Sequence, residues 1–162
     1  MECCIAKTYD DAKAREIGKQ IAVEVALLIH IEEAFRIALN WNTGGRGNIR
    51  KLSTLRFVAR SFERHLARVR ALSEFGGYMH LVSGRKPQMS EKIQILRQTR
   101  DELHVHLEKM LLEMEHCATD DATAFEAICV ELENYLGELA SHAQQEAELL
   151  QLCFADPEGG SG

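Results

Sequence analysis

Histidine and glutamate side chains that could bind a metal ion interrupt the apolar faces of the predicted helices. His142 and Glu146 are four residues apart, so a helix places them one turn apart on the same inward face. His65 falls within the apolar stripe of an earlier helix, and His30 falls at the edge of another. Imidazole and carboxylate groups bind iron, manganese and zinc, often inside helical bundles. These four residues are therefore candidate metal ligands, although a histidine at a core edge often serves only as a hydrogen-bonding group.

Arg100 is the exception within the apolar stripe of the third predicted helix, between Leu96, Leu103 and Leu107. A guanidinium stays protonated and only donates hydrogen bonds, so it cannot bind a metal ion. Burying it without an acceptor is strongly unfavourable, so we expect a carboxylate beside it. Counting along antiparallel third and fourth helices at about 1.5 Å per residue brings Glu146 near the height of Arg100. We therefore predict a buried ion pair between Arg100 and Glu146.

Helix-breaking residues divide the chain into predicted helices near residues 10–40, 50–82, 90–117 and 123–154. Helices of about 25–33 residues would be about 40–50 Å long at 1.5 Å per residue, which suits a bundle better than a compact globin-like fold. The sequence thus predicts an all-α, up-down-up-down four-helix bundle. A coiled-coil oligomer is the alternative interpretation. It ranks second because no sustained heptad with flanking charge pairs is present.

The helical wheel also predicts which residues face the core. In the first helix the apolar side is set by Leu27, Ile31, Ala34, Phe35 and Ala38. On the other helices the same construction turns His65, His142 and Glu146 inward, and it places polar residues on the opposite faces. We expect Glu32, Arg64 and Glu108 to face solvent.

Length and composition favour one helical domain over residues 1–154, followed by a flexible tail at 155–162. The net charge of −6 argues against nucleic acid as a partner. No apolar run approaches the ~18 residues of a membrane span and no signal peptide is evident, so we expect no membrane association and a cytoplasmic location. The five cysteines include no CxxC pair, so neither a disulfide framework nor a zinc site is indicated.

Three segments, at residues 65–79, 96–103 and 142–151, resemble the bacterial hemerythrin-like, or HHE cation-binding, domains. The resemblance covers essentially the whole chain. The resemblance implies a four-helix bundle that binds a non-haem di-iron pair for oxygen binding, iron or redox sensing, or signalling. His142 and Glu146 match the fourth-helix ligands of that family. His65 matches its second-helix histidine, and His30 is the candidate for its first-helix histidine.

Two positions depart from the family pattern. Val69 or Ser73 stands where the second helix usually has an acidic residue, and Thr99-Arg100 stands where the third usually has a Glu-His pair. An arginine in place of a ligand would repel the ions that it replaced. His104, one turn from Arg100, would reach the site only if the third helix rotated.

Two functions of different classes follow from these observations. In the first, the chain holds one or two iron ions for oxygen, iron or redox sensing. In the second, which we favour, the metal site is degenerate, the Arg100–Glu146 pair takes its place, and the bundle is a regulatory or interaction module without a cofactor. Its partner would be another protein or a second copy of the chain. An enzyme is not indicated, because no catalytic triad order and no glycine-rich phosphate loop is visible.

Overall fold

The computed structural model describes residues 2–42, 48–74 and 87–154. Within these residues it contains no strand, a short 3-10 helix η1 (Pro87–Met89) and four α-helices: α1 (Glu2–Asn40), α2 (Asn48–Glu74), α4 (Ser90–His116) and α5 (Ala122–Phe154). The all-α, four-helix prediction is therefore confirmed. The first helix begins at residue 2 instead of about residue 10. The predicted end of the second helix near 82 and the predicted tail at 155–162 lie outside the described residues.

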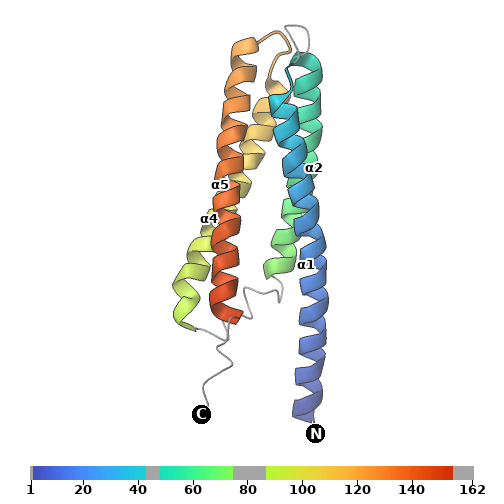
Figure 1. Cartoon of the computed structure of the whole chain (residues 1–162), viewed down its shortest axis with the longest axis vertical. Helices are drawn as coiled ribbons and strands as arrows, with labels where there is room; N and C mark the ends of the chain where they lie inside the picture. Colours follow the sequence, from blue (N-terminus) through green and yellow to red (C-terminus); the bar gives the residue numbers. More distant parts are fainter. Residues whose placement is uncertain (1, 43–47, 75–86, 155–162) are drawn as a thin grey trace.

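The helices are long and lie side by side, with α1 next to α2 and α4 next to α5 (Figure 1). α1 and α2 are antiparallel: Glu24 contacts His65, whereas Leu39, further along α1, contacts Lys51, near the start of α2. α2 also packs on α4, so the order around the bundle is α1, α2, α4 and α5. No helix in the described ranges is long and apolar enough to cross a membrane.

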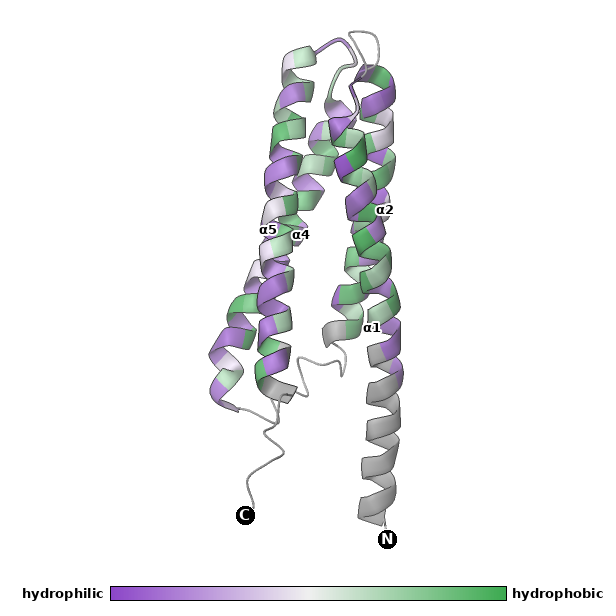
Figure 2. Ribbon diagram, viewed as in Figure 1, coloured by the Kyte–Doolittle hydropathy of each residue, from purple (hydrophilic) through white to green (hydrophobic). Residues whose placement is uncertain are grey.

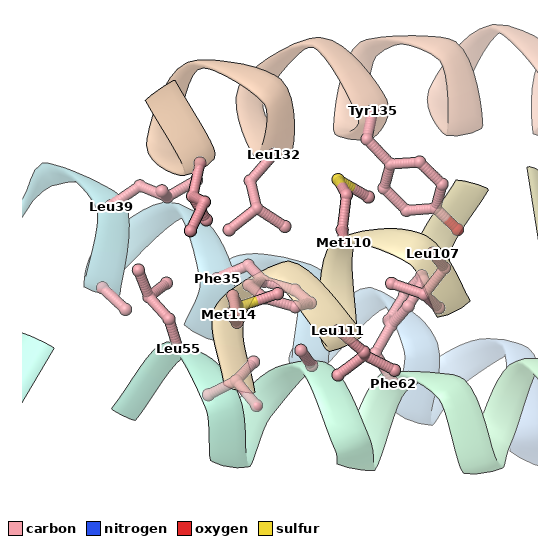
Figure 3. Close-up of a cluster of buried hydrophobic side chains, with 14 of the residues drawn as sticks. Phe35, Leu39, Leu55, Phe62, Leu107, Met110, Leu111, Met114, Leu132 and Tyr135 are labelled. Atoms are coloured by element: carbon pink, nitrogen blue, oxygen red, sulfur yellow. The ribbon is translucent and has the colours of Figure 1, made fainter. Parts of the chain in front are cut away.

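Apolar side chains from all four helices form the core near the end of the bundle where α1 and α4 end and α2 and α5 begin. Hydrophobic and hydrophilic residues are interspersed along the coloured part of each helix (Figure 2). Met110 and Met114 of α4 lie between the α5 side chains Leu132 and Tyr135 and the opposite helices (Figure 3). The Phe62 ring packs edge-on against Phe35 and Tyr135, with centroids 5.8 and 6.4 Å apart, a favourable geometry for aromatic pairs. This shared core extends to Leu66 in α2 and Leu103 in α4.

The inward stripe of α1 agrees with the prediction at Ile31, Ala34, Phe35 and Ala38 and departs from it at Leu27. Leu27 is 39% exposed, whereas its neighbour Leu28 packs against the core with Ile31, Ala34 and Phe35. The stripe therefore continues from Phe35 through Ile31 and Leu28, which turns Leu27 away from the core. The placement of Leu27 in the stripe is wrong.

Basic side chains of α2 donate hydrogen bonds to main-chain carbonyls at the C-terminal ends of α1 and α4. Arg56 donates from Nε to the carbonyl of Met114 at 2.7 Å and from Nη2 to the carbonyl of Cys117 at 3.2 Å, just past the end of α4. Lys51 donates to the carbonyl of Leu39 at the end of α1. The last carbonyls of a helix have no partner within it and carry partial negative charge, so a cation stabilises them. Part of the basic character of α2 is therefore structural.

Candidate functional site

The Arg100 side chain is buried in α4 and forms an ion pair with Glu146 of α5. Arg100 is 5% exposed, and the Glu146 side chain is 19% exposed. The guanidinium Nη2 donates to Glu146 Oε1. The contact predicted from the sequence is therefore present. The Glu146 carboxylate is neutralised by a positive charge of the same chain.

His142 lies one turn before Glu146 and is 5% exposed. Its Nε2 is 3.0 Å from the carbonyl oxygen of Leu96 in α4 and 3.8 Å from Glu146 Oε1. A carbonyl oxygen only accepts, so this hydrogen bond requires a proton on Nε2. A ring nitrogen that holds a proton has no lone pair for a metal ion, so in this arrangement the Nε2 of His142 acts as a hydrogen-bond donor between two helices.

His65 of α2 belongs to a second, separate polar pair. Its Nδ1 is 2.6 Å from Oε2 of Glu24 in α1, and these side chains are only 20% and 14% exposed. Arg68 approaches the other carboxylate oxygen of Glu24 at 3.5 Å. As a carboxylate accepts hydrogen bonds, Nδ1 of His65 is the donor. The expected inward position of His65 is therefore partly met, and its partner is a residue of the neighbouring helix.

His30 does not join either pair. Its side chain is 76% exposed, and its Nδ1 lies 3.6 Å from Glu33 on the same outward side of α1. The expectation that His30 lies at the edge of the apolar stripe is wrong, because the stripe runs from Ile31 to Leu28 and leaves His30, like Leu27, on the outward side. From this position, the His30 ring does not approach the interior of the bundle.

Two histidines of α4, His104 and His106, pair with carboxylates at its flanks. His104 Nε2 is 3.3 Å from Glu108 in the same helix. His106 Nε2 is 3.0 Å from Glu131 of α5, and this hydrogen bond is the main cause that lowers the pKa of the Glu131 carboxyl. The His106 ring also packs edge-on against Tyr135, with centroids 5.5 Å apart.

The four candidate ligands do not converge on one point. No group of three or more histidine, cysteine, aspartate or glutamate side chains within the described ranges is arranged to hold a metal ion. Moreover, a permanent cation, Arg100, contacts Glu146, and His142 directs a proton toward a carbonyl. The residues present do not fit the di-iron centre that the family resemblance implies.

The end of the shared core explains why two separate polar pairs form. Arg100, His142 and Glu146 lie beyond Leu103, where the residues of α4 and α5 no longer belong to the core shared by all four helices. Glu24 likewise lies one turn before Leu28 in α1. Each antiparallel pair of helices therefore satisfies its own buried carboxylate, because an unpaired buried charge is strongly unfavourable.

Glu24 is the site residue that the sequence interpretation missed. In the observed stripe of α1, residues Leu28, Ile31 and Phe35 are inward, and Glu24 is the next position at the same spacing. A glutamate at a stripe position is the signal that would have found it.

Compared with known proteins, the chain matches no family model, no curated protein and no solved structure.

Proposed function

We propose that this chain is a metal-independent helical bundle of hemerythrin-like type that acts as a non-catalytic interaction or regulatory module. The observation that carries the proposal is the ion pair between Arg100 and Glu146. In a metal-binding relative a carboxylate at this place would need a metal ion for charge balance. Here the guanidinium provides that balance, so the fold requires no metal.

The second support is the way in which the histidines are used. His142 donates to the carbonyl of Leu96, and His65 pairs with Glu24, so both side chains have structural partners within the bundle. His30 faces away from them, at 76% exposure. The iron-binding alternative would require His30 and His65 to move toward α5 and Arg100 to leave it. We therefore favour the metal-independent function.

An interaction role is favoured over catalysis by what the surface offers. Large apolar side chains such as Ile37, Phe57 and Val105 are more than half exposed on the outer faces of the helices. Exposed apolar side chains of this size are suited to binding another protein. By contrast, Arg100 and His65 are engaged with the carboxylates of neighbouring helices.

Thermal unfolding with and without metal tests the proposal. We expect the purified chain to have the same midpoint in a strong chelator, in added ferrous iron under anaerobic conditions and in added zinc. A bundle held together by a resident metal would lose stability in chelator, because metal binding contributes directly to folding free energy. A clear drop in the midpoint with chelator, reversed by iron, would contradict the proposal.

A further inference from the structure

The outer face between α2 and α4 carries large apolar side chains that no other described residue covers. Phe57 of α2 is 72% exposed, and Val105 and Leu112 of α4 are 63% and 57% exposed. Phe57 and Leu112 line one groove of about 650 Å³, together with the charged side chains of Arg64 and Glu108. Exposed apolar groups beside complementary charges are typical of a protein–protein contact.

Two stripes of outward residues border this groove. The stripe on α2 comprises Phe57, Arg60 and Arg64, which line the groove, and continues to Ala67. The stripe on α4 comprises Glu108, Leu112 and Glu115, which line the groove, and continues to Val105. In both stripes the residues are spaced by three, four and three positions. This spacing keeps side chains on one face of a helix along the direction in which a second helix would pack.

The contacts between α2 and α4 fix which residues are at the same height. Arg56 donates to the carbonyl of Met114, and Arg70 forms an ion pair with Asp101 at 2.9 Å. The two helices are therefore antiparallel, and each step along α2 corresponds to one step back along α4.

This alignment makes the two stripes complementary to each other. Arg64 is level with Glu108, and Ala67 is level with Val105. Among the described residues Arg64 forms no ion pair, and Glu108 pairs only with the neighbouring His104. Arg64 and an exposed glutamate thus stand at one height on adjacent helices.

We infer that this face binds a second copy of the chain, with a two-fold axis parallel to the bundle. Such an axis lays α2 of one copy on α4 of the other and leaves every residue at its own height. Arg64 then faces Glu108 of the second copy, and Ala67 receives Val105. Phe57 packs against Leu112, about one helical turn away. Each of these contacts occurs twice.

The charges of the two helices select this arrangement over the others. α2 contains seven Lys or Arg residues and two Glu, whereas α4 contains six acidic residues and four Lys or Arg. A two-fold axis perpendicular to the bundle would place α2 on α2 and bring Arg60 and Arg64 against their own copies, which is repulsive. Self-complementarity of charge and shape therefore points to a second copy as the occupant. The inference rests on the interaction role proposed above and names its partner.

Sedimentation velocity across a concentration series tests the contact. We expect the full-length chain to form a dimer that dissociates on dilution and in high salt. Phe57→Ser should raise the dissociation constant about tenfold or more, since the largest apolar side chain of the contact is lost. Val130→Ser is the matched control, because Val130 is 54% exposed on α5, away from this face, and should leave the dimer unchanged.

Charge reversal provides a sharper test. Arg64→Glu and Glu108→Arg should each weaken the dimer, because each places like charges opposite each other twice. In an equimolar mixture of the two variants, both contacts again join opposite charges, so a heterodimer should form. Glu133→Arg on α5 is the control and should change nothing. A chain that stays monomeric throughout, or a mixture that associates no better than its components, would overturn the inference.

These results are independent of the metal test. If the parent chain shows no dimer and chelator leaves the unfolding midpoint unchanged, only the self-association fails. If chelator lowers the midpoint, the metal-independent function fails whatever the oligomeric state.

Discussion

The imidazole of His142 donates from Nε2 to the main-chain carbonyl of Leu96, 3.0 Å away, and so links the interior faces of α5 and α4. Beside this bond, Arg100 contacts Glu146, and the three side chains form one buried polar cluster between two helices. A cluster in which charges and hydrogen bonds are satisfied internally can stabilise a specific packing without a cofactor.

Removing Arg100 should strand the Glu146 carboxylate. We expect Arg100→Ala to reduce the free energy of unfolding by about 3–5 kcal/mol, the usual effect of breaking a buried pair from one side. Urea denaturation monitored by circular dichroism measures it. The double variant Arg100→Leu with Glu146→Leu is the matched control and should recover most of the loss. Equal losses in the single and double variants would show that the pair is not coupled.

Arg56 should stabilise the fold through the end of α4. Its Nε and Nη2 groups donate to the carbonyls of Met114 and Cys117. We expect Arg56→Ala to destabilise the chain by about 1–3 kcal/mol, because hydrogen bonds from a charged donor are lost. Arg60→Ala removes the solvent-exposed Arg60–Glu115 pair instead and should change stability by about 1 kcal/mol or less. Equal effects of the two substitutions in urea unfolding would contradict this role of Arg56.

The sequence was most informative where one helix face is clearly apolar. In α4 the predicted stripe through Leu103, Leu107 and Met110 is buried, and Arg100 lies buried within it. The regular spacing of the stripe shows which face of the helix is buried. Because Arg100 is on that face, a carboxylate of another helix had to lie beside it. This is why the Arg100–Glu146 contact could be predicted.

The course of the inward stripe of α1 before Ile31 could not be derived in the same way. Apolar residues occupy nearly every position from Val23 to Ile31, so several rotations bury a similar apolar area. Packing against α2 decides among them and brings Glu24 to His65. The tautomer of His142 was also beyond the sequence, because it depends on the nearby carbonyl of Leu96.

Tyr135 offers a test of the core. Its ring is fully buried, its hydroxyl has no hydrogen-bond partner in the described part of the chain, and burial raises its pKa. We expect Tyr135→Phe to leave the free energy of unfolding unchanged or to raise it by about 1 kcal/mol, since an unsatisfied buried group is removed. Tyr135→Ala should lower it by about 3–5 kcal/mol. A large loss in the phenylalanine variant would mean that the hydroxyl has a partner.

The contact between His106 and Glu131 should give the bundle an acid-sensitive component. The hydrogen bond from His106 holds the pKa of Glu131 below its ordinary value of 4.5. A lowered folded-state pKa stabilises the fold above the ordinary value, and this stabilisation is lost as pH falls through the folded value. On acidification from pH 7 to below 4.5, the free energy of unfolding of Glu131→Gln should therefore fall by about 0.5 kcal/mol less than that of the parent chain. The difference is small because the pair is partly exposed.

Urea unfolding at both pH values measures this difference, with Glu126→Gln as the control on the same helix. The control should lose stability on acidification as the parent does. If Glu131→Gln behaved like the control, the hydrogen bond would make no pH-dependent contribution.

The metal content of the chain, purified without chelator, tests the central claim most directly. Elemental analysis combined with the absorption spectrum between about 300 and 500 nm reports both bound iron and an oxo-bridged pair, which absorbs there. We predict no stoichiometric iron, manganese or zinc and no band in that range, because Arg100 already neutralises Glu146. One or two iron ions per chain, with the corresponding absorption, would contradict the account.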